Sequence, residues 1–379
     1  MVRPGPLRPL AGVVGVVVAV CLLSAGCTSP APVDRSAPSP SVAAADTPAA
    51  RSQLVLDQAV AADLPGCSAA VGERGVVIWQ GVRGMADLET RTPISPDTIF
   101  DVASVSKQFT ATAALLLADR GELALSDPLS KHLTGLPSWS RTVTLDQLMH
   151  QVSGIPDFMD MLGVLPEEET GRERGLQVIS QVKFLASKPG NTWEYSNSNY
   201  LLLGLVVEQV SGQPLAEFLR ENIFGPLQLP MVMGSTSPLP GKAHSYRISS
   251  YGDWEIADWH VDVTGAGGIQ TTPEALVRWA DNYRTGRVGG KELLKEQLAG
   301  AELMDPADTT VSGPGGSRYG AGIVSDPDGT LWHDGEYGGF HSEFFVLPDR
   351  QRAIAVACNS SGTNIAALRE SLTEIWQTT

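Results

Sequence analysis

The chain has 379 residues, of which 42 are acidic and 27 are Lys or Arg, so its formal net charge at pH 7 is −15. This balance argues against nucleic acid or an anionic lipid surface as a partner, because both require basic patches. The length allows one large domain or two smaller ones with a substantial core. No C-x-x-C or H-E-x-x-H motif occurs, and the six histidines are scattered, so the sequence predicts no metal site.

The first 27 residues predict an export signal. Arg3 and Arg8 precede an unbroken apolar or Gly run over residues 10–23, and small residues then lead to Cys27. A run of this length is too short to cross a bilayer as an anchor. The segment before Cys27 resembles a bacterial lipobox, although a serine stands three positions before the cysteine, where leucine is more usual. We expect residues 1–26 to be a signal peptide and Cys27 to be lipidated, with plain secretion as the alternative.

Residues 27–50 form the next segment, which is rich in Pro, Ala and Ser and has almost nothing to bury. It predicts a disordered tether between the lipid and a folded domain over residues 51–379. Cleavage before Cys27 would leave 25 basic and 42 acidic residues, a net charge of −17. We therefore expect an exported monomer on the extracellular or periplasmic side that meets the membrane only through its N-terminal lipid.

The order of the predicted elements indicates the fold class. Apolar spacing and turn residues predict a helix at 53–63, strands at 67–71 and 76–79, a helix after residue 104 that ends at Gly121, helices at 145–149, 176–186, 199–210, 214–219 and 272–283, strands at 319–324, 331–333, 343–347 and 353–358, and a helix at 365–376. This order predicts an α/β (α+β) fold, in which one antiparallel sheet built from both ends of the chain is flanked by helices. An all-helical subdomain is expected over about 121–262, with the active site at the junction.

Ser104 and Lys107 form an S-x-x-K motif at the predicted start of a helix. Residues three apart lie on one face, so the Lys107 amine can reach the Ser104 hydroxyl. A buried and partly neutral lysine can take the hydroxyl proton, and the free N–H groups of the helix start can stabilise an oxyanion. A lone S-x-x-K also arises by chance, so the motif needs partners.

Two downstream motifs supply candidate partners. Tyr195 and Asn197 stand in a turn before a helix, where a phenol and a carboxamide can point the same way; the alternative is a packed Tyr ring with Asn197 as helix cap. His333 and Gly335 lie on a predicted strand, where the missing side chain lets a substrate lie along the strand edge and the Glu336 N–H can complete an oxyanion hole. Taken alone, His333 would more often be a structural histidine.

The ordered set S-x-x-K, Y-x-N, H-x-G resembles the serine β-lactamase-related family, which includes class C β-lactamases, serine DD-peptidases and family VIII esterase-like hydrolases. The likeness extends over residues 53–376 through the blocks T-P-I-S-P-D-T-I-F-D-V-A-S-V-S-K-Q-F-T-A, V-S-G-I-P-D-F, E-Y-S-N-S-N-Y-L-L-L-G, G-A-G-G-I-Q-T-T and H-D-G-E-Y-G-G-F-H-S. The resemblance implies the β-lactamase/DD-peptidase fold and a two-step acyl-enzyme reaction without metal or cofactor.

The resemblance also implies a role for each matching residue. Ser104 matches the acylated nucleophile, Lys107 its neighbouring base and Tyr195 the residue that passes protons to the leaving group. Asn197 matches the residue that holds the substrate amide, and the N–H groups of Ser104 and Glu336 match the oxyanion hole. In the implied fold the first and last strands are antiparallel neighbours, so Cys67 and Cys358 are expected to form a disulfide, with two separate buried thiols as the alternative.

Some residues depart from the family pattern. His333 replaces the lysine of class C β-lactamases, Asp334 replaces a hydroxyl residue, and Gln151 and Val152 replace a frequent His-Thr pair, a change expected to alter packing only. An ionised Asp334 facing the substrate would repel a carboxylate, which predicts a preference for neutral or amine-bearing esters or amides. The alternative is that Asp334 points away from the cleft.

The expected function is therefore hydrolysis of an ester or amide, possibly of a D-amino-acid or cell-wall peptide type, through an acyl-serine intermediate. A DD-carboxypeptidase or a β-lactamase is the first alternative. A penicillin-binding or cell-wall-sensing lipoprotein without turnover is the second, and the intact set of Ser104, Lys107 and Tyr195 argues against it.

Overall fold

The computed structural model describes residues 46–163, 170–234, 239–300, 302–304 and 314–377. The predicted signal peptide, Cys27 and most of the predicted tether lie outside these residues. Within the described part of the chain, no helix combines the length and the apolar character needed to cross a membrane.

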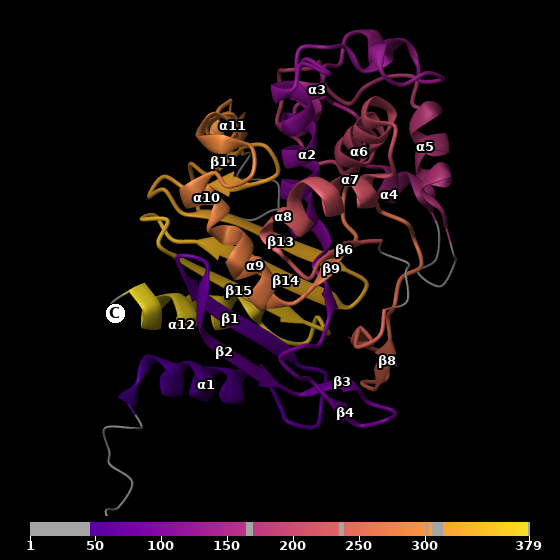
Figure 1. Ribbon diagram of the computed structural model, residues 1–379. Coiled ribbons are helices and arrows are strands. Elements are labelled where there is room, and N and C mark those ends of the chain that lie inside the picture. Colours follow the sequence, from indigo (N-terminus) through magenta and orange to yellow (C-terminus); the bar gives the residue numbers. More distant parts are fainter. Residues whose placement is uncertain (1–45, 164–169, 235–238, 301, 305–313, 378–379) are drawn as a thin grey trace, which may run out of the picture. The chain divides into compact units, whose positions relative to one another are not determined.

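Strands from both ends of the chain build one antiparallel sheet, as expected (Figure 1). The spatial order is β10-β11-β12-β13-β14-β15-β1-β2. The strands are β1 (Cys67–Glu73), β2 (Val76–Arg83), β10 (Glu302–Leu303), β11 (Arg318–Tyr319), β12 (Val324–Ser325), β13 (Leu331–Tyr337), β14 (Phe340–Val346) and β15 (Arg352–Cys358).

The first strand and the last strand are antiparallel neighbours, and their register places Cys67 directly opposite Cys358. The two cysteines form a disulfide. Both residues are fully buried, so the bond ties the two ends of the folded chain together inside the sheet.

Helices cover both faces of this sheet. Gly72 of β1 faces Val277 of α9 (Pro273–Ala280), whereas Arg352 of β15 donates to the carbonyl of Trp376 in α12 (Ile365–Gln377). Arg352 lies next to the partner of Gly72 in the ladder, and neighbouring residues of a strand point to opposite faces. The Trp376 indole also donates to Ser52 of α1 (Pro48–Ala59) at 2.8 Å, which joins the terminal helices.

The remaining helices gather mostly beside the sheet (Figure 1). They are α2 (Lys107–Asp119), α3 (Leu145–Met149), α4 (Phe158–Leu162), α5 (Arg172–Ser180), α6 (Asn197–Ser211), α7 (Leu215–Leu219), α8 (Gly225–Leu227), α10 (Asn282–Thr285) and α11 (Gly290–Leu298). The helix at Leu145–Met149 has the predicted bounds.

The subdomain at 121–262 is not all-helical, and that part of the prediction is wrong. β6 (Val232–Met233) joins β5 (Phe100–Asp101) and β9 (Ile269–Thr271) in a small sheet, and β7 (Tyr246–Ile248) pairs with β8 (Trp254–Ile256). These strands are only two or three residues long, too short to show a period in the sequence. A further short pair, β3 (Met85–Asp87) and β4 (Thr92–Pro93), precedes Ser104 in the chain.

Three other predicted elements differ from the structure. The first helix begins at Pro48, inside the predicted tether, because Thr47 caps it by accepting the Ala50 N–H. The helix expected at 176–186 is α5, which ends earlier; the carbonyl of Val182 instead accepts the Trp139 indole N–H at 2.8 Å. The single strand expected at 319–324 is the pair β11 and β12, separated by a turn in which Gly322 adopts a φ of +72°.

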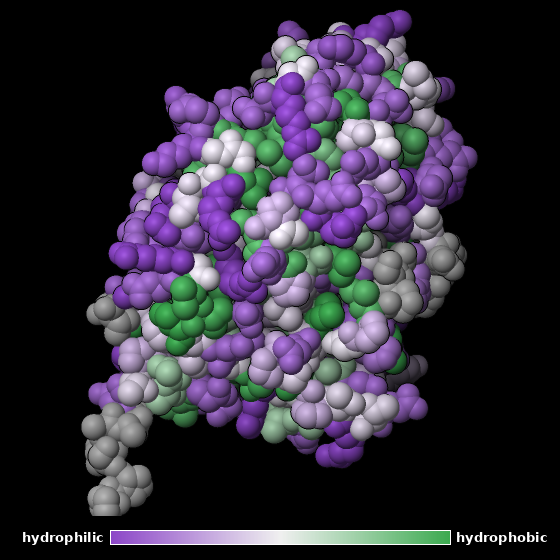
Figure 2. All heavy atoms as spheres, viewed as in Figure 1, coloured by the Kyte–Doolittle hydropathy of each residue, from purple (hydrophilic) through white to green (hydrophobic). Residues whose placement is uncertain are grey.

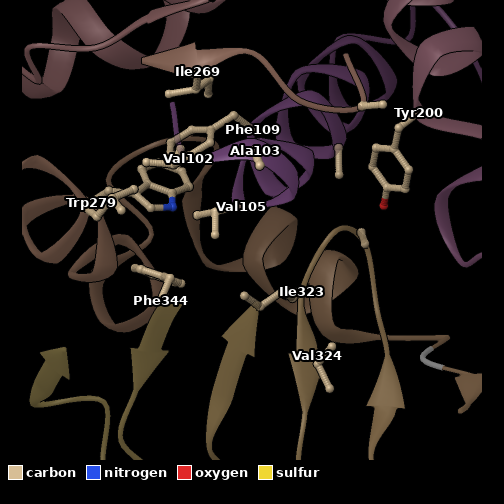
Figure 3. Close-up of a cluster of buried hydrophobic side chains, with 14 of the residues drawn as sticks. Val102, Ala103, Val105, Phe109, Tyr200, Ile269, Trp279, Ile323, Val324 and Phe344 are labelled. Carbon is tan, nitrogen blue, oxygen red and sulfur yellow. The ribbon is translucent and has the colours of Figure 1, made fainter. Parts of the chain in front are cut away.

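The helix α2 lies at the centre of the core, and its side chains from Lys107 to Leu117 are all buried. The ring centroid of Phe109 lies 4.7 Å from that of Trp279 and 5.6 Å from that of Phe224. In Figure 3, Phe109 and Trp279 lie together above the strands that carry Val324 and Phe344. Hydrophilic residues cover most of the face seen in Figure 2, where apolar residues appear in separate patches. Because α2 is enclosed, the position of Lys107 at its first turn is rigid.

Candidate active site

Ser104 lies in a 3₁₀ turn, Ala103–Ser106, which leads directly into α2. The turn is strained, because Ala103 has a φ of +48°, in the left-handed region that favours glycine. Two hydrogen bonds hold it: Asp101 Oδ1 accepts the Ala103 N–H at 2.8 Å, and Ser342 Oγ donates to the Val102 carbonyl at 2.8 Å. The predicted placement of Ser104 at a helix start is confirmed.

Lys107 is fully buried beside the serine. Its Nζ lies 2.9 Å from Ser104 Oγ, 2.8 Å from Asn197 Oδ1 and 2.6 Å from the Ala266 carbonyl oxygen. Burial lowers the pKa of Lys107 to about 7, although Asp157 and Asp334 act in the opposite direction. The amine is therefore partly neutral near neutral pH.

The three partners of Lys107 decide where its lone pair points when the amine is neutral. A carbonyl oxygen can only accept a hydrogen bond, so Asn197 Oδ1 and the Ala266 carbonyl take the two N–H donors. Ser104 Oγ is the one partner of the three that carries a proton to donate. The neutral amine is thus directed at the Ser104 hydroxyl, as a general base requires.

Tyr195 lies just before α6 and also contacts the serine. Its phenol is hydrogen-bonded to Ser104, and its ring centroid lies 4.9 Å from Lys107 Nζ. Burial, together with nearby Tyr319, raises the pKa of Tyr195 well above its usual value. The phenol therefore stays protonated at neutral pH and is available as a proton donor beside Ser104.

Asn197 is the first residue of α6, and Ser196 rather than Asn197 occupies the cap position. Its side-chain oxygen accepts from Lys107, and its backbone N–H and Nδ2 both donate to Asp157 Oδ2 at 2.8 Å. Asn197 is among the residues that line the cavity.

His333 is buried on β13 and is neutral. Its Nδ1 faces the Asp334 carbonyl oxygen at 2.6 Å and its Nε2 faces the Tyr319 hydroxyl at 3.0 Å. Since a carbonyl only accepts, Nδ1 carries the proton and Tyr319 donates to Nε2. Burial, with the charge of Lys107, lowers the pKa of His333 to about 3. Unlike the lysine that it replaces, His333 offers no positive charge to a substrate.

Gly335 brings β13 against the serine turn. A Cβ at this position would lie 2.4 Å from the Val102 carbonyl oxygen and 3.0 Å from the Ser104 backbone nitrogen, so no larger residue fits. Both Gly335 and Glu336 line the cavity with Ser104. The strand edge and the serine turn are therefore close enough to share one substrate carbonyl, as an oxyanion hole requires.

Asp334 is among the residues that line the cavity, and 42% of its side chain is exposed. It stands opposite Glu343 in the ladder, so the alternation of β13 places its side chain on the other face from Gly335, which meets the Ser104 turn. Partial burial and nearby Glu343 raise the pKa of Asp334 to about 6. Glu336 is exposed, and His341, 3.3 Å away, lowers the pKa of its carboxyl group.

The cavity has a volume of about 530 Å³ and lies where residues from the sheet and from the helical part meet. Its charged lining is acidic: Asp160, Asp334 and Glu336. Among the described residues, no Lys or Arg lines it. Trp259 and Tyr337, whose rings lie 5.5 Å apart edge to face, form an aromatic wall.

The structure thus brings together the eight predicted catalytic and substrate-binding residues. Sequence reasoning overlooked Asp157, although an aspartate between a proline and an apolar run is a recognisable helix cap. It also missed Tyr319, for which the sequence offers no local signal. Gln151, which is expected to alter packing only, is buried, and its Oε1 accepts hydrogen bonds from the Ser196 N–H and from Asn199 Nδ2. Within the described residues, no group of three or more His, Cys, Asp or Glu side chains is arranged to hold a metal ion.

Comparison with known proteins identifies the family. The family model described as β-lactamase matches residues 53–372. The chain belongs to the β-lactamase family. Protein flp of Staphylococcus aureus (strain MW2) is 26% identical over 337 residues, covering 85% of this chain and 66% of flp. The chain therefore spans just under two thirds of the length of flp. Penicillin-binding protein 4* of Bacillus subtilis is 28% identical over 191 residues, covering 50% of this chain and 41% of that protein.

Two solved structures share the fold. The octameric penicillin-binding protein homologue from Pyrococcus abyssi is 25% identical, with a TM-score of 0.73 over 83% of this chain and 73% of that one. The D-amino acid amidase from Ochrobactrum anthropi SV3 has a TM-score of 0.75 over 86% of this chain and 98% of its own. At 22% identity, the second likeness concerns the fold alone.

Proposed function

We propose that the chain is an exported serine hydrolase that cleaves an amide or ester through an acyl-enzyme on Ser104. The observation that carries the proposal is the contact between Lys107 and Ser104. A fully buried lysine, with its pKa lowered to about 7, lies 2.9 Å from the hydroxyl that it would deprotonate. Such a lysine serves as a base at neutral pH without any added group.

In the proposed acylation, Ser104 Oγ bonds to the substrate carbonyl carbon while its proton moves to the neutral amine of Lys107. The N–H groups of Ser104 and Glu336 stabilise the oxyanion. The bond from the carbonyl carbon to the leaving group then breaks, and the leaving nitrogen or oxygen takes the phenol proton of Tyr195. Lys107 then passes the proton that it took from Ser104 to Tyr195. Water hydrolyses the resulting ester and regenerates Ser104.

The proposed substrate is a neutral or amine-bearing amide or ester rather than a carboxylate-bearing one. Three acidic residues are among those that line the cavity, and the lysine behind it is fully buried. The solved relatives include a D-amino acid amidase, which makes amides of D-amino acids the first compounds to assay. The aromatic pair Trp259 and Tyr337 suits an apolar or aromatic side chain on such a substrate.

The test is covalent labelling followed by intact-mass measurement. We expect a serine-directed fluorophosphonate or a penicillin to add to the wild type once, and Ser104→Ala to remain unlabelled. An adduct that survives Ser104→Ala would refute the assignment of the nucleophile. A panel of small esters, D-amino acid amides, cephalosporins and a D-Ala-D-Ala peptide then ranks the substrates.

A penicillin-binding lipoprotein that is acylated without turnover is the second candidate. Two similar proteins favour it: penicillin-binding protein 4* of Bacillus subtilis and the penicillin-binding protein homologue from Pyrococcus abyssi. A stable adduct with penicillin, together with no hydrolysis of any compound in the panel, would favour this candidate over the hydrolase.

Export and lipidation at Cys27 form the remaining part of the proposal. The disulfide between Cys67 and Cys358 suits an oxidising compartment. Metabolic labelling with a fatty acid tests the lipid, and Cys27→Ser is expected to abolish incorporation.

A further inference from the structure

The carboxylate of Asp157 lies behind the cavity rather than in its lining, and it links two segments of the helical part. Oδ1 accepts the Met159 N–H at 2.8 Å at the start of α4, while Oδ2 accepts both the backbone N–H and the Nδ2 of Asn197 at 2.8 Å. One carboxylate thus receives three N–H donors. Two of these belong to a residue 40 positions away in the chain.

These contacts fix which way the Asn197 carboxamide faces. Its Nδ2 meets Asp157, and its Oδ1 meets Lys107 Nζ at 2.8 Å. The opposite orientation would place an amide N–H₂ against an amine and an amide oxygen against a carboxylate, with no favourable pairing. Asp157 therefore holds one N–H of Asn197, presents the carboxamide oxygen to Lys107 and leaves the second N–H for a ligand in the cavity.

We propose that Asp157 is a positioning residue for acylation, which orients Asn197 toward substrate and anchors Lys107 through the Asn197 carboxamide. The proposal deepens the proposed function and rests on it. Asp157 touches neither Ser104 nor the cavity, so it acts through Asn197 and through its charge. Removal of that charge leaves the Lys107 ammonium less stable, so the neutral base persists to lower pH.

The groups that face Lys107 are few. They are Asp157 and Asp334, whose charges favour the ammonium form, and His333, Tyr195 and Tyr200, which carry no charge at neutral pH. Of the two carboxyl groups, Asp157 opposes the effect of burial on the pKa of Lys107 more strongly than Asp334 does. Its loss is therefore expected to appear directly in the pH dependence of the base.

Asp157→Asn and Asp157→Ser are the test variants, because Asn and Ser can each still cap α4 while lacking the charge. Ser198→Ala is the matched control: it removes a 2.7 Å hydrogen bond to the Pro156 carbonyl between the same two segments and touches neither Lys107 nor the Asn197 side chain. The purified full-length chain is labelled with a fluorophosphonate from pH 5 to pH 9, and the acylation rate constant is plotted against pH.

We expect the wild type and Ser198→Ala to share one acid limb with a midpoint near pH 7. In both Asp157 variants the midpoint should fall by about one pH unit. The ratio of acylation by an N-acylaminoacyl ester to acylation by a simple acetate ester should also fall about tenfold, because only the former has an amide for Asn197 to hold.

An unchanged midpoint in a folded Asp157 variant would overturn the proposal, even if the plateau rate fell. Failure of both variants to fold, judged by circular dichroism and thermal melting, would reduce Asp157 to a structural cap and would also overturn it. Absence of labelling in the wild type would instead refute the proposed function itself.

Discussion

Replacement of Asp334 by threonine should relax discrimination against carboxylate-bearing substrates. Asp334 lines the cavity beside a neutral His333, whose pKa is lowered to about 3, so the imidazole does not offset the carboxylate above that pH. Two like charges about 4 Å apart repel by about 4 kcal/mol at an effective dielectric near 20 and by about 1 kcal/mol in water. Because 42% of the side chain is exposed, we take about 1–2 kcal/mol, which corresponds to roughly 5- to 30-fold in rate.

The pH dependence of this discrimination has a defined sign. The pKa of Asp334 is raised to about 6, so the group is ionised above pH 6 and neutral below it. A substrate carboxylate with an ordinary pKa near 4 stays ionised throughout this range. The penalty on an acidic substrate should therefore be present at pH 7.5 and shrink as the pH falls through 6.

The assay compares two esters that differ only in a carboxylate on the leaving side. The ratio of kcat/KM for the neutral and the acidic ester is measured from pH 5 to pH 8 in the wild type, Asp334→Asn and Asp334→Thr. Asp334→Asn is the isosteric control, which removes charge without changing shape. A wild type that prefers the acidic ester, or a ratio that is the same in all three proteins, would refute the charge argument and favour a DD-carboxypeptidase.

Two further predictions concern the base and the disulfide. The acylation rate should rise with pH through a midpoint near 7 as Lys107 loses its proton, and a pH-independent rate would contradict its role as the base. Lys107→Arg should lower the acylation rate by about 100-fold or more, because the guanidinium group stays charged. The Cys67→Ala/Cys358→Ala variant should lose about 2–5 kcal/mol of unfolding free energy in urea, and the wild type unfolded without reductant should show no thiol from these positions; two titratable thiols there would contradict it.

Local patterns predicted the fold where one element carries its own signal. The sequence shows the strand signal directly in the apolar runs of β1, β2 and β15. It shows the helix signal in the three-residue spacing of Ser104 and Lys107. By contrast, β6 and β9 are too short for a period, and their pairing exists because the chain between them folds back. The end of α5 likewise depends on a distant partner, since the Val182 carbonyl accepts the indole N–H of Trp139, a residue 43 positions earlier.

The candidate site divides in the same way. The contact between Ser104 and Lys107 could be predicted from the sequence, because the two residues lie one helical turn apart. The contact between Asp157 and Asn197 joins residues 40 positions apart, so an aspartate with the appearance of an ordinary cap gave no sign of its second partner. The charge state of His333 follows from complete burial and from the Tyr319 hydroxyl, both of which are properties of the packed chain.

Asp157 and Asp334 share one effect, on the pKa of Lys107, and differ in their effect on substrate preference. Burial lowers the pKa of Lys107, while Asp157 and Asp334 both raise it, so removal of either carboxylate should move the acid limb of acylation toward lower pH. Their other effects differ, because Asp334 lines the cavity and Asp157 reaches it only through Asn197. Loss of Asp334 should change the preference between neutral and acidic esters, whereas loss of Asp157 should change the preference between amide-bearing and simple esters. An Asp334 variant that also changed the preference between amide-bearing and simple esters would show that the cavity had been deformed, because the hydrogen bonds that orient Asn197 come from Asp157 and Lys107.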